Sequence, residues 1–415
     1  GGRDAGGDAV AGVDRDRVRR AQLVLIVRGH QRDLEPVEHV GGHRHADHAA
    51  GVADGEGHQL GRRLGGGEDD VALVLAVLVV HHDDRLALGD VGDGLLDLGE
   101  ALGPLETLAL PLLSPVDLQC VKACGVTFAL SALERVIEER ARGDASAAAD
   151  IRSRLEERVG GSIRAVVPGT PEAAALKAAL IEDGLWSQYL EVAIGPDAEV
   201  FTKAPILSSV GPGAPIGIRS DSTWNNPEPE IVLLVNAAGA AIGATLGNDV
   251  NLRDFEGRSA LLLGKAKDNN ASCALGPLIR LFDEDFTIDD VRNAEVELTI
   301  DGPEGYRLEG ASSMNQISRD PLELVRQTLS EHQYPDGFAL FLGTLFAPVQ
   351  DRDEPGRGFT HKAGDRVAIS TPRLGKLVNE VVTSKDAAAW DFGVIALMTN
   401  LAARGLLNTQ QKDPA

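Results

Sequence analysis

The chain has 415 residues, with 40 basic and 63 acidic side chains and a formal net charge of −23. Nucleic-acid binding relies on basic patches, so this excess of acid disfavours a nucleic-acid partner, and it disfavours anionic membrane surfaces as well. The longest apolar run, 71–80, is half the length that a bilayer crossing needs, and no signal-peptide pattern opens the sequence. We therefore expect a soluble, cytoplasmic protein.

Residues 1–100 differ in composition from the rest of the chain. They contain no Phe, Trp, Tyr, Lys, Ser, Thr, Asn, Cys or Met, yet they carry eight of the ten histidines. A packed domain without aromatic residues is improbable, so we expect no core here. Three interpretations stay open: an out-of-frame translation joined near residue 100, a disordered extension, and a metal tract around His43, His45 and His48. The missing initial Met is consistent with a fragment.

Residues 101–190 are predicted to form a helical preface. Apolar residues recur every three to four positions from 117 to 140, and Ala, Leu, Glu and Arg then dominate. Gly143 ends the first helix, Asp144 caps the second, and Pro171 lies in the first turn of the third. The predicted helices cover 127–142, 145–159 and 171–183.

The three cysteines are too few for a disulfide framework. Cys120 and Cys124 stand four apart, which places them on one helical face and does not match Cys-x-x-Cys spacing. Together with Cys273 they are expected to be buried free thiols.

From 191 to 409 the pattern changes to short β-rich runs separated by Gly and Pro. The predicted strands cover 192–194, 200–203, 206–209, 231–236, 240–248, 294–300, 307–312, 338–342, 366–370 and 375–380. Short helices over 288–292 and 321–331 interrupt them. Many short strands with turn residues between them predict an α+β protein with a mixed β-roll or barrel-like sheet, not a doubly wound parallel sheet.

Two carboxylates stand at the start of one predicted strand. Glu228 and Glu230 are followed directly by the apolar run 231–235. Residues two apart point to the same side of a strand, so both carboxylates are expected to face one spot. Asp249, at the end of the next apolar run, adds a third. Such an all-oxygen site suits Mg²⁺ or Mn²⁺ with positions left open for a substrate, whereas the alternative is a pair of solvated strand-edge charges.

These acidic residues resemble the metal-binding signature of the fumarylacetoacetate hydrolase family. The resemblance rests on Glu228-x-Glu230 and on residues 247–254, and it extends over 102–407. One branch of the family, the 2-keto-3-deoxy-pentonate dehydratases of oxidative pentose breakdown, is similar over 118–144, 186–203 and 332–348. The resemblance implies a mixed β-roll, a divalent cation and a small 2-oxo sugar acid as substrate, and we expect a homo-oligomer.

The resemblance also implies how the chemistry works. A cation that chelates the 2-oxo acid makes the C3 protons acidic. Glu199 lies beside an apolar strand, where burial raises a carboxyl pKa, so it is our candidate base; a solvated edge glutamate is equally compatible. Lys267 matches the site lysine of the family and would neutralise the substrate carboxylate or protonate the leaving group, unless it is an ordinary exposed lysine.

Further candidates are expected to bind the substrate: Lys203, Ser208, Asn248, His332 and Thr344. Asn248 adjoins the metal aspartate and would also orient it. His332 precedes a Gln-Tyr-Pro-Asp-Gly turn and is interpreted either as a substrate-facing donor or as a core or turn histidine. Thr344 resembles the Gly-Thr pair of the family, and the alternative is an ordinary strand threonine.

Two functions are weighed. The first is a lyase that dehydrates 2-keto-3-deoxy-D-xylonate to 2-oxoglutarate semialdehyde. The second is a hydrolase that cleaves a carbon–carbon bond of an acylpyruvate, for which the family uses a His/Glu pair to activate water. In those hydrolases the histidine precedes Glu-x-Glu, whereas this sequence has no histidine between His82 and His332. This difference favours the dehydratase.

Deletion of residues 1–99 tests the interpretation of the first segment. Because no packed core is expected there, solubility and turnover should be unchanged or improved, as measured by circular dichroism and steady-state kinetics. A cooperative loss of folding would instead identify a genuine domain.

Overall fold

The computed structural model describes residues 22–28, 72–78, 113–155, 163, 166–346, 348, 350–355, 357–403 and 406. Of the first hundred residues it describes two strands, β1 (Gln22–Arg28) and β2 (Ala72–Leu78), which pair antiparallel. The histidine tract around His43 lies outside the described residues, as does the end of the second predicted helix. The expectation that residues 1–100 form no core stays a prediction.

A six-stranded sheet carries the acidic cluster. Its strands, in spatial order, are β10 (Cys273–Leu281), β8 (Ala241–Asp249), β7 (Pro229–Val235), β13 (Phe338–Phe341), β3 (Cys120–Gly125) and β4 (Glu199–Ala204). Only β13 and β3 run parallel among its neighbouring pairs. Every residue of β7 is buried, with Ile231 and Leu233 in the main core and Val232 and Leu234 in a cluster on the other face. The uninterrupted apolar run therefore reflects burial on both faces.

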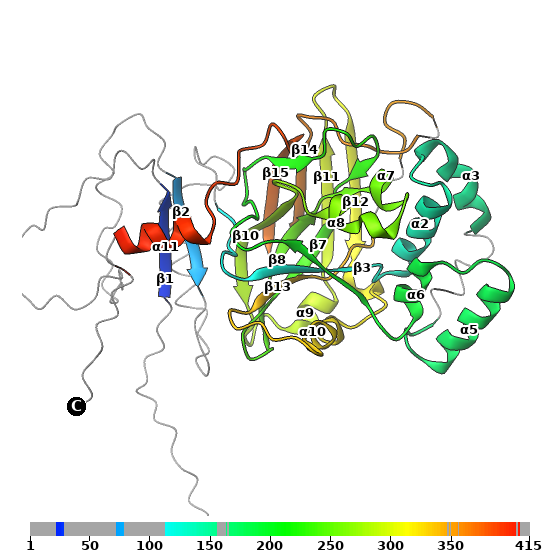
Figure 1. The fold of residues 1–415 in the computed structure, drawn as a ribbon, viewed down its shortest axis with the longest axis horizontal. Coiled ribbons are helices and arrows are strands. Elements are labelled where there is room, and N and C mark those ends of the chain that lie inside the picture. The colour runs from blue at the N-terminus through cyan, green and yellow to red at the C-terminus, as the bar shows by residue number, and fades with distance from the viewer. Residues whose placement is uncertain are drawn as a thin grey trace, which may run out of the picture.

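A five-stranded sheet packs against the first one (Figure 1). Its strands are β12 (Arg307–Ser313), β11 (Glu295–Asp301), β14 (Arg366–Thr371), β15 (Gly375–Thr383) and β5 (Ile216–Ile218), and β15 and β5 run parallel. Inward residues such as Leu298 and Ile369 share one core with Ile231 and Leu233. A short ladder joins β6 (Asn225–Asn226) to β9 (Asn251–Leu252). The expected α+β fold with a mixed β-roll is confirmed.

Helices gather at one end of the sheets (Figure 1): α2 (Ala129–Arg140), α3 (Ala145–Leu155), α5 (Pro171–Glu182) and α6 (Gln188–Ile194). The others are α7 (Arg253–Glu256), α8 (Leu263–Lys267), α9 (Ile288–Arg292), α10 (Pro321–Leu329) and α11 (Val394–Ala403), with 3₁₀ turns at Ala260–Leu262 and Met314–Gln316. Helix α2 buries a stripe that includes Leu133, Val136 and Ile137. None of the described helices is both long and apolar enough to cross a membrane.

Two predicted strands differ from the structure, and so does the expected place of the cysteine pair. Cys120 and Cys124 lie on strand β3 and not on a helical face, because this segment pairs with β13 and β4 on either side. A spacing of four places Cys120 and Cys124 on one face of a strand as well as on one face of a helix, so it could not distinguish the two structures. Residues 192–194 lie in helix α6, which Ser187 caps, and 206–209 form a loop. Since β3 lies inside the main sheet, that sheet crosses the expected boundary at 190/191.

A buried arginine fixes the segment that leads into β4. The Nη2 atom of Arg319 donates hydrogen bonds to the carbonyls of Val192 at 2.8 Å and Gly195 at 2.7 Å, and to that of Asp197 at 3.3 Å. These carbonyls end helix α6 or follow it, where a helix lacks internal donors. Arg319 thereby positions the turn immediately before Glu199.

Candidate active site

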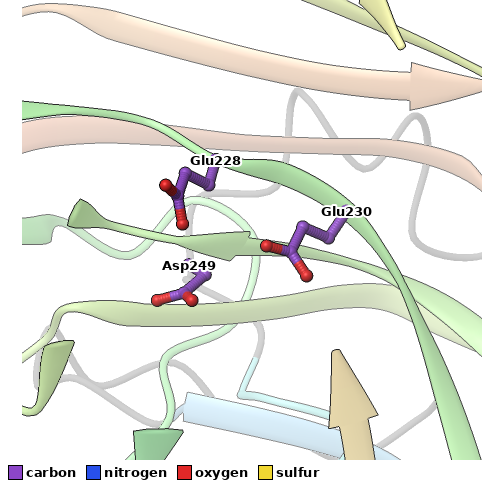
Figure 2. A group of neighbouring side chains, drawn as sticks. All are labelled: Glu228, Glu230 and Asp249. Carbon is purple, nitrogen blue, oxygen red and sulfur yellow. The ribbon is translucent and has the colours of Figure 1, made fainter. Parts of the chain in front are cut away.

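Three carboxylates meet at the shared end of β7 and β8. Because the two strands are antiparallel, the start of β7 lies beside the end of β8, and the Asp249 backbone N–H donates to the Glu228 carbonyl at 3.0 Å. One oxygen each of Glu228, Glu230 and Asp249 lies within 4.8 Å of the others, and all three residues are buried (Figure 2). The structure thus brings together the cluster that the spacing predicted.

Two lysines contact this cluster from the side of α8 and β4. Lys267 Nζ donates to Glu228 Oε2 and, at 2.9 Å, to Asp249 Oδ2. Lys203 Nζ lies 2.7 Å from Asp249 Oδ1 as an ion pair and donates to the Val250 carbonyl at 3.1 Å. Both oxygens of the buried Asp249 carboxylate are therefore close to a lysine ammonium group.

Two of the carboxylates differ in proton affinity. Burial raises the pKa of Glu230 well above its usual value, and repulsion from Asp249 and Glu228 adds to it, although the Gly343 N–H at 2.7 Å opposes the shift. Burial would also raise the pKa of Asp249, but Lys203 and Lys267 outweigh it and the pKa is lowered. The lysines thus favour the charged form of Asp249, whereas the surroundings of Glu230 favour its protonated form.

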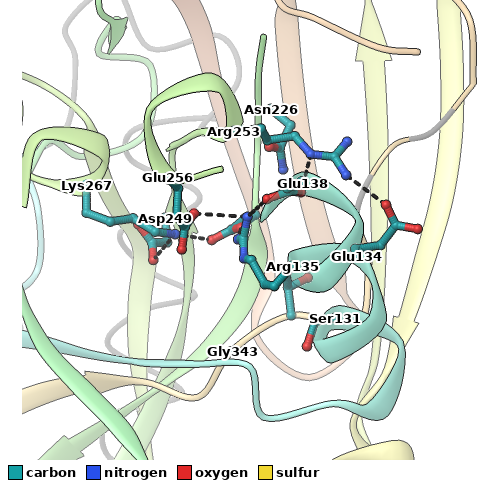
Figure 3. A network of polar contacts seen from close by, with 12 residues as sticks. Ser131, Glu134, Arg135, Glu138, Asn226, Asp249, Arg253, Glu256, Lys267 and Gly343 are labelled. Atoms are coloured by element: carbon teal, nitrogen blue, oxygen red, sulfur yellow. Dashed lines mark hydrogen bonds and ion pairs between the residues drawn. The ribbon is translucent and has the colours of Figure 1, made fainter. Parts of the chain in front are cut away.

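Helix α2 covers the cluster with an arginine (Figure 3). Arg135 Nη2 lies 2.5 Å from Glu228 Oε1, and Nη1 lies 2.6 Å from Glu138 and 2.9 Å from Glu256. Burial raises the pKa of Glu256 to about 7, even though Arg135 opposes the shift. The Arg135 guanidinium thereby connects helix α2 to the acidic cluster and to helix α7.

A second arginine anchors the same helix. Arg253 donates from Nε to Glu138 at 2.6 Å and from Nη2 to Glu134 at 2.9 Å, and its guanidinium lies over the Trp224 ring at 4.6 Å. Both carboxylates belong to α2, so Arg253 holds that helix against α7 and β6.

The residues between α2 and the two strands line a cavity of about 30 Å³. Most of the lining residues have polar or charged side chains. They include the three carboxylates, Cys124, Gly125, Ser131, Glu134, Arg135, Glu138, Phe201, Asn226, Arg253, Glu256, Lys267, Gly343 and Thr344. The predicted Lys267 and Thr344 are thus lining residues.

Glu199, the first residue of β4, lies beside the lining residue Gly125 but does not itself line the cavity. Burial raises the pKa of Glu199, while Arg135 and Lys267 lower it in part. Its Oε2 atom is buried and has no hydrogen-bond partner among the described residues. Gly125, its neighbour on β3, makes room for it, because a Cβ on Gly125 would lie 2.1 Å from that oxygen. A raised pKa next to charged neighbours is the environment of an acid–base group.

Two of the predicted substrate-binding residues support the cluster from behind. Asn248 accepts a hydrogen bond from the Glu228 backbone N–H at 3.1 Å, which fixes the strand that carries the first carboxylate. Lys203 is fully buried beneath Asp249. Neither residue lines the cavity.

Ser208 and His332 lie away from it. The Ser208 hydroxyl donates to the Pro205 carbonyl at 2.7 Å. His332 is exposed, stacks on Tyr334 and precedes β13, which runs antiparallel to β7 with Phe338 opposite Val235. That end of β13 is separated from Glu230 by five residues of strand, or roughly 17 Å. The structure therefore brings neither residue to the acidic cluster.

Sequence reasoning missed Arg135, Glu138 and Glu256. The first two lie three apart on α2, on the face opposite its apolar stripe, where charged residues usually meet solvent. Only the packing of α2 over the sheet turns this face inward. The one local sign of these residues in the sequence was that Arg135 and Glu138 stand three apart, a spacing at which an arginine and a glutamate can pair on a helix.

Comparison with known proteins agrees with this geometry. Residues 186–382 match the family described as "Fumarylacetoacetate (FAA) hydrolase C-terminal". A probable 2-keto-3-deoxyxylonate dehydratase of Haloferax volcanii is 32% identical over 202 residues, covering 49% of this chain and 66% of that protein. A 2-dehydro-3-deoxy-D-arabinonate dehydratase of Saccharolobus solfataricus is 32% identical over 183 residues, covering 44% of this chain and 58% of that protein. The chain thus spans less than two thirds of the length of these curated relatives.

A solved structure of 2-keto-3-deoxy-D-arabinonate dehydratase complexed with magnesium and 2,5-dioxopentanoate is 25% identical, with a TM-score of 0.46 over 65% of this chain and 74% of that one. The matched segment 186–382 contains the three carboxylates, Glu199 and Lys267. This segment is therefore the part of the chain that is similar to the fumarylacetoacetate hydrolase family.

Proposed function

We propose that this protein is a divalent-cation-dependent hydro-lyase that dehydrates 2-keto-3-deoxy-D-xylonate to 2-oxoglutarate semialdehyde. The observation that carries the proposal is the cluster of three buried carboxylates with Lys267, together with a half-buried Glu199 whose pKa the charges of this cluster influence. The names of both curated relatives support the substrate, because both describe one compound. Xylonate and arabinonate differ only at C2 and C3, and neither carbon is a stereocentre in a 2-keto-3-deoxy acid, so C4 is the one stereocentre left.

The residues present fit a hard divalent cation. Glu228, Glu230 and Asp249 offer only oxygen, which Mg²⁺ and Mn²⁺ prefer, and three protein ligands leave coordination positions for a substrate. Burial and then repulsion from Asp249 and Glu228 raise the pKa of Glu230, and a cation at the cluster would oppose that repulsion. A cation bound here would polarise the C2 carbonyl oxygen of a 2-oxo acid and make the C3 protons more acidic.

Glu199 is proposed to take the C3 proton. Its raised pKa brings the carboxylate closer to the operating pH, where a general base is most effective. Lys267 carries a positive charge that Asp249 and Glu228 hold in place, and it would donate toward the departing C4 hydroxyl. The C3 proton and the C4 hydroxide leave together as water. A proton then moves from C5 to C3, and the resulting C4=C5 enol gains a proton at C4 as its hydroxyl loses one, which gives the aldehyde.

The geometry disfavours the hydrolase alternative. Carbon–carbon hydrolysis of an acylpyruvate needs a histidine beside a glutamate to activate water. Within the described part of the chain, neither His332 nor His361 lines the cavity. Localisation in the cytoplasm and homo-oligomer formation stay expectations from the sequence.

Product identity is the direct test of the function. With Mg²⁺ and 2-keto-3-deoxy-D-xylonate, we expect 2-oxoglutarate semialdehyde, detected by NMR, and we expect EDTA to abolish its formation. Faster release of pyruvate from an acylpyruvate than dehydration of the sugar acid would replace this function with the hydrolase.

Cation binding is tested at Glu228. Glu228→Gln should weaken Mg²⁺ binding by more than about 10-fold in calorimetry, because even outer contacts of metal sites contribute that much. Glu284→Gln makes the same chemical change at an exposed position and serves as the control. Equal Mg²⁺ affinity in both variants would remove Glu228 from the ligand set.

The catalytic roles are tested by Glu199→Gln and Lys267→Met. Each should lower turnover about 10²–10⁴-fold, the usual contribution of positioned acid–base catalysis, while cation binding survives. Lys265→Met is the matched control, since Lys265 lies two residues earlier and is exposed. Near-full dehydration by Lys267→Met would show that the role assigned to that lysine is wrong.

A further inference from the structure

The enclosed site is too small for the substrate that it is proposed to bind. A cavity of about 30 Å³ holds one or two water molecules, whereas small-molecule sites usually measure about 300–1,000 Å³. A pentonate can therefore reach the carboxylates only after part of the wall moves. The segment most suited to move is the part of the cavity wall whose contacts with the three carboxylates are easiest to break.

Arg135 attaches helix α2 to the cluster. Its guanidinium lies 2.5 Å from Glu228 Oε1, which is an oxygen of a proposed cation ligand. The other oxygen of Glu228 accepts from Lys267. Both oxygens of this carboxylate are therefore already paired with positive groups, and a cation at the cluster must displace or repel at least one of them.

The lysines have little freedom to move. Lys203 is fully buried and also donates to the Val250 carbonyl, so its departure would leave charge and donors unpaired in the interior. Lys267 is buried as well and retains Asp249 as a second partner in the cluster. Arg135 differs, because Glu138 and Glu256 keep its charge paired when it releases Glu228. Arg135 is therefore the group whose displacement costs least.

We propose that the cation displaces Arg135 from Glu228 and that this exchange opens the cavity to the substrate by loosening helix α2 around Arg135, while the contacts of Arg253 keep the helix attached to α7. The inference rests on the proposed cation site and substrate, but it concerns which side chain of this protein competes with the cation. Arg135 is then a positioning residue that sets cation affinity and access, and it contacts neither reacting carbon.

Cation affinity gives the first test, with Mn²⁺ as the probe in an electron paramagnetic resonance titration. Arg135→Met removes the competitor and should bind Mn²⁺ about 10-fold more tightly, in the range of one charge-assisted hydrogen bond. Arg140→Met removes the same charge from the same helix at an exposed position and should change affinity less than about 2-fold. If Arg135→Met fails to fold, Arg135→Gln repeats the test with a polar side chain.

Hydrogen exchange of helix α2 gives the second test. In the unchanged protein, Mg²⁺ should accelerate exchange over Ala129–Arg140, with Pro321–Leu329 of α10 as the internal reference. In Arg135→Met, exchange over α2 should be fast from the start and insensitive to Mg²⁺. The inference would be overturned if the Arg135 variants bound Mn²⁺ as weakly as the unchanged protein or more weakly. Slower hydrogen exchange of α2 with Mg²⁺ would overturn it as well.

These measurements do not depend on turnover. An inactive protein that shows both effects would refute the proposed reaction and leave the exchange of Arg135 intact. A protein that dehydrates the sugar acid without these effects would refute the role of Arg135 alone.

Discussion

The pairing of buried ionisable groups is the constraint on which the site depends. Five buried carboxylates line one small cavity, and four buried or nearly buried basic side chains contact them. The carboxylates are Glu138, Glu228, Glu230, Asp249 and Glu256, and the basic residues are Arg135, Lys203, Arg253 and Lys267. Removing one partner from such a network leaves its counterpart charged in a medium that solvates it poorly. The network therefore joins β7, β8, α2, α7 and α8 into one unit.

Spacing along the chain predicted the parts of this unit that are local or follow strand geometry. Glu228 and Glu230 share a face because a strand has a period of two, and Asp249 joins them because a hairpin returns the next strand to the same end. The helices over 127–142 and 171–183 were predicted within about two residues of the observed α2 and α5, since apolar spacing and Pro171 are local signals. The mixed β-roll followed from many short strands with turns between them.

The rest depended on contacts between distant segments. Cys120–Gly125 becomes a strand because β13 and β4 offer it two ladders, and no local pattern reports that. Arg135 and Glu138 are buried only because α2 lies over the sheet, whereas on the sequence they are typical of a solvated helix face. His332 and Thr344 stand close in sequence but at opposite ends of β13, so only Thr344 lines the cavity. The short distance between His332 and Thr344 in the sequence therefore did not indicate that a strand separates them in the structure.

Gly125 couples two positions that are distant in sequence. The space beside its Cα holds Glu199 Oε2, and a Cβ at position 125 would lie 2.1 Å from that oxygen. Any larger residue would therefore make the flexible end of Glu199 turn away from its present place. A change at 125 thus moves a carboxylate on the neighbouring strand while residue 199 itself stays the same.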